Sequence, residues 1–333
     1  MTRRTVLGGS VGLAAGLVSA APFLLPRYDR VRKPARSRVA ILYADSYSEG
    51  LAQNLWKSLQ LFRLDLRGKA SLLKPNLVEY IPGNHVNTHP LLVAAAAECF
   101  MRLGARSVVV AEGPGHQRDT QFVLSESGFE RQLKEQNIRF IDLNRDELIP
   151  TRLRATYTGL THLWLPRWKP TLWFQCPRSS KIKTHHWSGA TLSMKNMFGV
   201  VPGTKYGWPK NLLHWRGIQQ SIVDICATVP LHFAIVDGIV AMEGNGPLNG
   251  TPRRLNRVVL ADDPVAADAS CARLMGFEPD RIAHIHETAK FLGNSSTAAI
   301  EQLGEPVGAP DAPFEAVPEF EYLRVTRSVA GLS

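Results

Sequence analysis

Residues 88–111, with the sequence THPLLVAAAAECFMRLGARSVVVA, decide the fold class of this chain. The alanine-rich part predicts a helix over His89–Leu103, with Thr88 as its N-cap and Gly104 at its end. Ser107–Ala111 then predicts a buried strand. Outward from this unit, short apolar runs predict further strands at 38–43, 70–74, 138–141, 171–175, 232–237 and 257–261. Helical patterns lie between them at 50–62, 121–136, 218–227 and 264–275, with a helical region from about residue 189.

Strands that alternate with helices are typical of the α/β class. We therefore predict mostly parallel sheets flanked by helices, arranged as two α/β lobes with a cleft at the carboxyl ends of the strands. The predicted body covers residues 38–303, with possible lobes at 38–150 and 151–303. It follows a leader and basic linker at 1–37 and precedes an irregular tail at 304–333. The less regular residues 142–170 predict a connecting hairpin.

The composition excludes several classes of protein. Hydrophobic residues make up 44% and charged residues 20% of the 333 residues, which excludes a disordered chain and a polytopic membrane protein. The net charge is +10, but residues 1–38 hold eight basic side chains and one acidic one, so the rest carries only +3. We therefore expect no nucleic-acid partner, although a basic surface that binds nucleic acid or membrane remains a third interpretation.

The N-terminal segment predicts export. Thr2–Leu7 resembles a twin-arginine signal, an apolar stretch follows over Val6–Leu25, and small residues allow cleavage after Ala20. This pattern predicts a periplasmic or extracytoplasmic protein that uses the twin-arginine export machinery. The alternative is an uncleaved membrane anchor over residues 6–25, with membrane contact only through this segment. Six basic residues lie between Arg27 and Arg38, and basic segments tend to stay on the cytoplasmic side of a membrane, which argues against export.

A long stretch without acidic residues indicates where the chemistry lies. Residues 148–223 contain no Asp or Glu, but eleven Lys or Arg, four His and six of the seven Trp. A solvated surface mixes both signs of charge, so this stretch favours a cleft that faces an anion. A basic, tryptophan-rich packing region without a ligand is the alternative.

Within that stretch, Lys181, Lys183 and His185 follow a predicted strand, where ligands bind in open α/β sheets. The lysines offer charges to phosphate or carboxylate, and the histidine offers acid/base chemistry or a metal ligand. Lys195 and Asn196 interrupt an apolar run that we assign to the core, and a buried lysine requires a partner. His214 continues the series.

The same strand-end logic selects residues elsewhere. Lys74 and Asn76 end one predicted strand and Glu112 ends another. Asp237 ends a third strand and leads into a glycine-rich turn, whose polar residues are Glu243 and Asn245. Asp262 and Asp263 end a fourth, where Asp263 is also a candidate helix cap.

These short motifs, in this order, resemble the DUF 362 family, a domain of unknown function. The residues that carry the resemblance span about 38–290: Lys74–Asn76, Thr88–Pro90, Glu112–Gly113, Lys181–His185, Lys195–Asn196, Gly199, His214 and Asp237–Pro247. The resemblance implies the fold more than the reaction. Some members carry ferredoxin segments, but the four cysteines here lie far apart, which argues against an iron–sulfur cluster.

The function we expect is an enzyme that acts on a small anionic substrate. Lys183, His185 and Lys195 are the candidate catalytic residues. The candidate substrate-binding residues are Lys74, Asn76, Glu112, Lys181, Asn196, His214 and Asn245. The cofactor is unknown; a divalent metal on Asp237 and Glu243 with His185 is one option. The alternative function is a periplasmic protein that binds an anion or a metal without turnover.

Overall fold

The computed structural model describes residues 28, 33–48, 50–115, 119–167, 172–308, 310 and 312–325, and for residues 172–180 it describes the backbone alone. The predicted twin-arginine signal, its cleavage site and the apolar stretch lie outside the described residues. None of the helices in the described part of the chain has the length and hydropathy that a membrane span requires.

One nine-stranded sheet organises the molecule, with the strand order β11-β1-β10-β9-β7-β2-β3-β4 and β8 paired with β7. The strands are β1 (Ser37–Tyr43), β2 (Ala70–Leu73), β3 (Ser107–Glu112), β4 (Arg139–Asp142), β7 (Leu172–His185), β8 (Gly189–Thr191), β9 (Phe233–Asn245), β10 (Asn249–Ala261) and β11 (Ile300–Gly304). A separate antiparallel pair, β5 (Leu148–Arg152) and β6 (His162–Pro166), confirms the predicted connecting hairpin.

Helices cover both faces of this sheet, which confirms the α/β class. They are α1 (Gly50–Leu59), α2 (Pro90–Arg102), α3 (Thr120–Glu126), α4 (Phe129–Glu135), α5 (Ser193–Asn196), α6 (Gly203–Tyr206), α7 (Asn211–Trp215), α8 (Ile218–Thr228), α9 (Pro264–Leu274) and α10 (Ala283–Thr288). Short 3-10 segments lie at Met197–Val200, Pro279–Arg281, Thr297–Ala299 and Pro318–Leu323.

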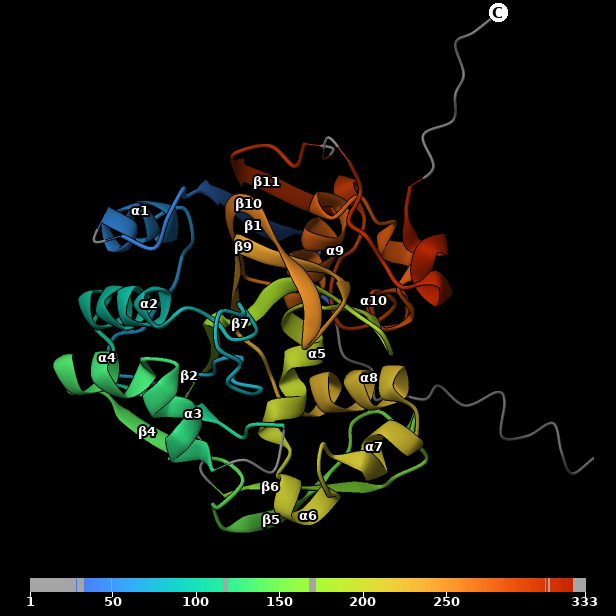
Figure 1. Cartoon of the computed structure of the whole chain (residues 1–333), viewed down its shortest axis with the longest axis horizontal. Helices are drawn as coiled ribbons and strands as arrows, with labels where there is room; N and C mark the ends of the chain where they lie inside the picture. Colours follow the sequence, from blue (N-terminus) through green and yellow to red (C-terminus); the bar gives the residue numbers. More distant parts are fainter. Residues whose placement is uncertain are drawn as a thin grey trace, which may run out of the picture.

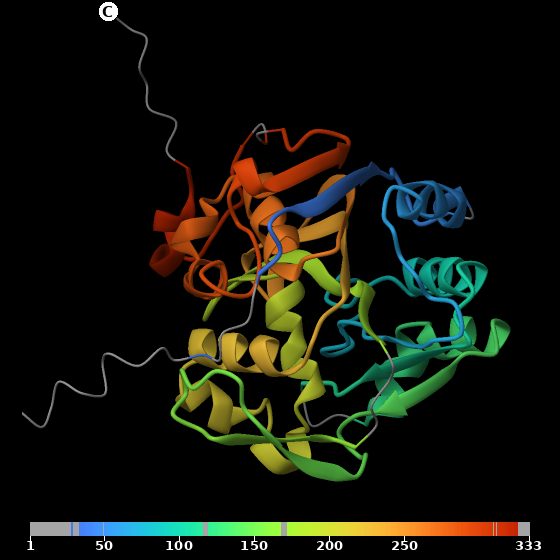
Figure 2. The same cartoon turned by 180° about the vertical axis from the view of Figure 1, so that it is seen from behind.

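The sheet has a parallel and an antiparallel half. Within the run β9-β7-β2-β3-β4 the strands are parallel to one another, as the alternation of strands and helices predicts. The strand pairs β1–β10 and β10–β9 are antiparallel, and β11 returns parallel to β1 at the edge. Figure 2 shows this edge from behind, with blue β1 beside red β11. The possible boundary between two lobes, at residue 150, falls inside β5.

Two hydrophobic clusters lie on opposite faces of the sheet. Alternate residues of β1 supply both: Val39 and Ile41 enter the cluster with α5, α8 and α9, and Ala40 enters the cluster with α1 and α2. This alternation follows from the two-residue period of a strand. Figure 1 accordingly shows α1, α2 and α4 grouped away from α9 and α10.

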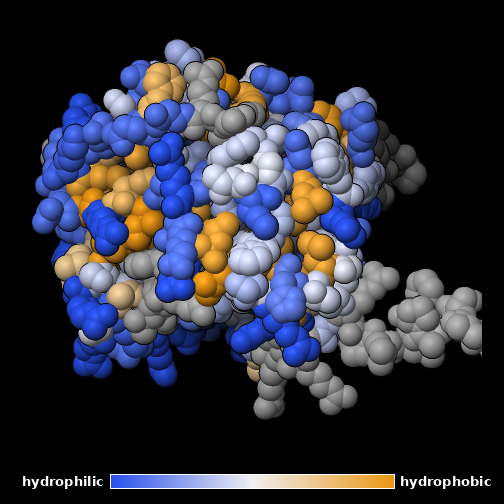
Figure 3. Space-filling model, turned by 90° about the horizontal axis from the view of Figure 1, so that it is seen from below, coloured by the Kyte–Doolittle hydropathy of each residue, from blue (hydrophilic) through white to orange (hydrophobic). Residues whose placement is uncertain are grey.

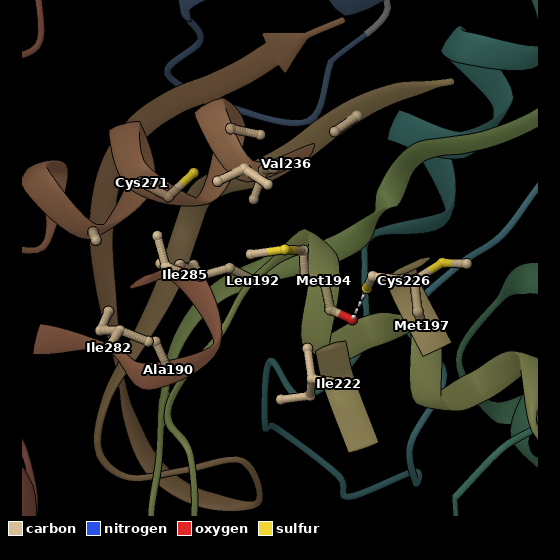
Figure 4. Packing of buried hydrophobic residues seen from close by; sticks show 14 of the residues in the cluster. Ala190, Leu192, Met194, Met197, Ile222, Cys226, Val236, Cys271, Ile282 and Ile285 are labelled. Carbon is tan, nitrogen blue, oxygen red and sulfur yellow. Dashed lines mark hydrogen bonds between the residues drawn. The ribbon is translucent and has the colours of Figure 1, made fainter. Parts of the chain in front are cut away.

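The apolar run around Lys195 is core, as the sequence predicts. Leu192, Met194 and Met197 are at most 1% exposed, and Figure 4 shows them packed beside Ile222 and Cys226. Cys226 Sγ lies 3.5 Å from the backbone oxygen of Met194. Cys99, Cys226 and Cys271 are free and buried. The side chain of Cys176 lies outside the described atoms.

Several local predictions need correction. The N-cap of α2 is His89 and not Thr88, because His89 Nδ1 accepts a hydrogen bond from Leu91 N at 3.3 Å. The glycine-rich segment after Asp237 is mostly strand, since β9 and β10 form one long hairpin whose register shifts between Arg254 and Arg257. The region from residue 189 begins with the short strand β8 rather than with a helix. The predicted cap role of Asp263 on α9 is confirmed.

The surface is mixed in character. On the side that carries β5, β6 and α6, Figure 3 shows patches of hydrophobic residues broken up by hydrophilic ones. Small separate patches of this kind are normal on a folded domain.

Candidate functional site

The carboxyl ends of β2, β3 and β7 meet at one cavity of about 190 Å³. We call it the lysine cavity, because the described residues of its wall include three lysines and one acidic residue. The wall consists of Asn76, Leu77, Val78, Glu112, Gly113, Gly115, Lys183, His185, His186, Trp187, Thr191, Lys195, Asn196, Phe198, Gly199, Pro209, Lys210, His214, Pro247 and Leu248. Seven of the twelve predicted site residues therefore lie together in it: Asn76, Glu112, Lys183, His185, Lys195, Asn196 and His214.

A buried ion pair supports one side of the cavity. Lys74 Nζ lies 2.8 Å from Glu112 Oε2, and both side chains are at most 2% exposed. The Lys74 ammonium also donates to Pro75 O at 3.0 Å, and the other carboxylate oxygen accepts from Gly113 N at 2.9 Å. Glu112 forms its ion pair with Lys74, and among the described residues no carboxylate forms an ion pair with Lys183, Lys195 or Lys210.

An amide network holds Lys183 in place. Its Nζ donates to Asn76 Oδ1 at 2.8 Å and to Val86 O at 3.2 Å. Asn76 Nδ2 in turn donates to Asn196 Oδ1 at 2.9 Å, and Asn196 Nδ2 donates to Pro75 O at 3.1 Å. Burial, reinforced by Lys181 and Lys195, lowers the pKa of Lys183 well below its usual value.

Lys195 projects from α5, whose amino end is fixed by a buried carboxylate. Asp268 of α9 accepts hydrogen bonds from Ser193 N at 2.6 Å and Met194 N at 3.0 Å. Lys195 Nζ lies 4.3 Å from the centre of the Phe198 ring. Burial and the nearby Lys74 ammonium lower the pKa of Lys195 to about 8.

Lys210 is a further lysine of the wall, and it was not among the site residues predicted from the sequence. It is 2% exposed, adopts φ +72°, and its Nζ donates to Gly113 O at 2.8 Å. Burial lowers the pKa of Lys210 to about 7. Its place in the acid-free stretch is the one sequence signal that points to it.

The three histidines of the wall present different atoms to the cavity. His185 Nδ1 accepts from Trp187 N at 3.0 Å, so a neutral ring carries its proton on Nε2 and can donate a hydrogen bond from there. Burial, with Lys195 nearby, lowers the pKa of His185 well below its usual value. His186 Nδ1 lies 2.7 Å from Gly246 O and His214 Nδ1 lies 3.1 Å from Lys210 O, so both rings donate from Nδ1 and keep a lone pair on Nε2. Burial lowers the pKa of His214 to about 4.

His186 is a candidate base that was not predicted from the sequence. In the sequence it stands beside His185 with nothing to separate their roles. The tautomer of each ring depends on hydrogen bonds to Trp187 N and Gly246 O, and the second of these comes from a turn sixty residues away. Trp187 was also not nominated; it is 52% exposed at the cavity wall.

Five of the twelve predicted site residues lie outside the cavity wall. Lys74 stands behind it in the Glu112 pair, and Lys181 Nζ donates to Asn87 O at 3.3 Å. Asn245 is exposed at the end of β9. Asp237 accepts from the Tyr47 hydroxyl at 2.8 Å, and Glu243 pairs with Arg253 at 2.7 Å.

The divalent metal therefore stays a prediction. In the described residues, no three His, Cys, Asp or Glu side chains are grouped so as to hold a metal ion. A metal-bound histidine usually donates from its second ring nitrogen, whereas His185 Nδ1 accepts. The geometry of His185 favours hydrogen-bond donation to a ligand.

The chain belongs to the family described as a domain of unknown function (DUF362), which matches residues 72–273 and so more than half of the chain. This match confirms the family resemblance, and it covers every nominated site residue. A similar protein is Thylakoid-associated protein sll1697 of Synechocystis sp. (strain ATCC 27184 / PCC 6803 / Kazusa). It is 26% identical over 289 residues, which cover 82% of this chain and 84% of that protein. No solved structure matches the chain.

Proposed function

We propose that the chain is an enzyme that acts on a small phosphate- or carboxylate-bearing substrate in the lysine cavity. The observation that carries the proposal is the charge of the wall. Lys183, Lys195 and Lys210 line about 190 Å³, and the one acidic residue among the described wall residues is already paired with Lys74. Buried charges require compensation, and a bound anion would supply it.

The ionisation of the wall favours catalysis over simple capture. Capture requires only charge and shape, whereas proton transfer requires groups that change protonation near neutral pH. Lys195 and Lys210 meet this requirement, with pKa values of about 8 and about 7. In the proposed roles, Lys183 binds the anionic group, His185 donates to developing negative charge, and Lys195 moves a proton.

Titration calorimetry with inorganic phosphate and with malonate tests the proposal on the full-length protein. Lys195→Met removes one charge and breaks no hydrogen bond to a described residue, while Lys183→Met removes the donor to Asn76. Each should weaken binding at least about tenfold, because a hydrogen bond to a charged group contributes about 1.5–3 kcal/mol. Lys205→Met makes the same charge change at an exposed position and should leave binding within about twofold.

Two results would contradict the proposal. Neither anion would bind, or all three variants would weaken binding equally, as expected for a diffuse surface effect. Thermal unfolding of each variant establishes that the protein is folded. If candidate substrates bind and are released chemically unchanged, the protein binds anions without turnover.

We also propose that the protein works outside the cytoplasm. The twin-arginine-like segment supports export, and the relative's name places that relative at the thylakoid. Residues 1–37 fused to a folded reporter should carry it across the membrane, and replacement of Arg3 and Arg4 by lysine should stop transport. Transport that survives the replacement would contradict use of the twin-arginine route.

A further inference from the structure

The three amines of the lysine cavity differ in what they contact. Lys183 Nζ donates to Asn76 Oδ1 and Val86 O, and Lys210 Nζ donates to Gly113 O. Lys195 Nζ lies over the Phe198 ring, and no oxygen of a described residue accepts a hydrogen bond from it. Lys195 is therefore the amine of the described wall that can leave its position without breaking a hydrogen bond within the protein.

The surroundings of Lys195 also raise the fraction of its neutral amine. Its pKa of about 8 leaves about one-tenth of the amine unprotonated at pH 7, compared with less than about one-thousandth for an ordinary lysine. Desolvation and a neighbouring cation are the two conditions that activate a lysine as a nucleophile. Both are present here, because the partly buried side chain lines the cavity and Lys74 lies nearby.

The wall also offers groups that suit a carbonyl beside an anionic group. Lys183 and Lys210 supply amino groups whose charged form a bound anion favours, and His185 presents a neutral Nε2–H donor. Thr191 is 3% exposed, and its Oγ1 is buried with no hydrogen-bond partner in the described part of the chain. An unpaired buried hydroxyl is costly, so a ligand oxygen is a suitable partner for it.

We propose that Lys195 forms an imine with the carbonyl carbon of a small 2-oxo acid bound in the lysine cavity. This inference rests on the proposed function, because it names the substrate class and the covalent step of the same site. The carboxylate of the acid lies against Lys183 and Lys210, and the carbonyl oxygen accepts from His185.

All protons and electrons that this step requires come from Lys195, the 2-oxo acid and a neighbouring lysine. The neutral Lys195 amine attacks the carbonyl carbon, a C–N bond forms, and the π electron pair moves to oxygen. A proton moves from nitrogen to that oxygen to give a carbinolamine. The C–O bond then breaks, the hydroxide takes a proton from a neighbouring lysine ammonium, and water leaves. The nitrogen lone pair forms the C=N bond, so the products are the iminium of Lys195, the neutral amine of the neighbouring lysine and one water molecule.

Reductive trapping tests the proposal. The full-length protein is incubated with pyruvate, and separately with 2-oxoglutarate, in the presence of sodium cyanoborohydride, which reduces an iminium to a stable secondary amine. Peptide mass spectrometry then locates the label. We expect at least one acid to label Lys195 at least tenfold more than the exposed Lys205. Lys195→Arg should abolish this label and keep the positive charge, and Lys205→Arg is the matched control.

The outcomes separate this inference from the proposed function. Label on Lys195 that falls when phosphate is added supports both. Phosphate binding that needs Lys183, with no label on Lys195 from either acid, overturns the imine and leaves the anion site standing. Label spread evenly over exposed lysines also overturns the imine. Absence of both binding and label overturns both.

Discussion

Lys74, Lys183 and Lys210 each donate hydrogen bonds to oxygen acceptors, and this explains how several buried cations coexist. Lys74 uses a carboxylate, Lys183 an amide oxygen and a backbone carbonyl, and Lys210 a backbone carbonyl. Neutral carbonyl oxygens satisfy the N–H groups without cancelling the charge. The site therefore keeps a positive potential that a set of ion pairs would remove.

Gly199 is the residue on which this arrangement depends most directly. A Cβ at this position would collide with Glu112 Oε1 and Lys74 Nζ. Breaking a buried ion pair costs about 3–5 kcal/mol, so we expect Gly199→Ala to lower the free energy of unfolding by about 3 kcal/mol. Urea denaturation measures the change. Gly115→Ala, where a Cβ meets nothing within 4 Å, should change it by less than about 0.5 kcal/mol. Equal stability of the two variants would contradict the packing described here.

The residues that follow strand ends, at the cavity wall and directly behind it, could be predicted from the sequence. Lys74 and Glu112 were predicted because β2 and β3 are short, apolar and separated by the helix α2. Lys210 and His186 were not, since the position of Lys210 requires a left-handed backbone and the role of His186 requires a contact with Gly246. Neither condition leaves a local pattern in the sequence.

At the scale of elements, α5 is positioned by its neighbour α9. Asp268 is fully buried and accepts from two backbone N–H groups at the start of α5. This contact fixes the direction in which Lys195 leaves the helix.

Asp268→Ala should lower the free energy of unfolding by about 3 kcal/mol, because it leaves two buried N–H groups without an acceptor. Asp268→Asn keeps one acceptor oxygen and should lose less, about 1 kcal/mol. Denaturant unfolding compares both with Glu126→Ala, an exposed acidic residue at the end of α3, which should be nearly neutral. If the alanine and asparagine variants were equally stable, the two hydrogen bonds would not support α5.

Some helices and strands can be predicted from local sequence patterns, and others cannot. The helix α2 and the strand β3 follow from an alanine-rich run, a glycine and a β-branched run. The full length of β9 and β10 does not, because Gly238, Gly244 and Gly250 and the polar residues of β10 are typical of loops. Their pairing with each other and with β1 and β7 overrides that local preference.

At the scale of the whole molecule, the lysine cavity makes stability depend on pH. Lys195 and Lys210 have folded-state pKa values of about 8 and about 7, below the value of about 10.4 in an unfolded chain. Between these values the unfolded chain binds more protons, so the contribution of these lysines to the free energy of unfolding rises as pH rises from about 7 to about 10.

Thermal unfolding between pH 7 and pH 9 checks this linkage. We expect Lys210→Met to show a smaller rise in melting temperature with pH than the unchanged protein. Bound phosphate favours the charged lysines, so it should stabilise more at pH 7 than at pH 9 and take up protons on binding. A Lys210→Met protein with an unchanged pH slope would contradict the predicted shift.

A crystal soaked in tungstate shows whether the lysine cavity binds an oxyanion. Tungstate has the tetrahedral shape of phosphate and scatters anomalously. We expect an anomalous peak in the cavity, within hydrogen-bond distance of at least two of Lys183, Lys195 and Lys210. Peaks confined to the outer surface, with the cavity free of anomalous density, would contradict it.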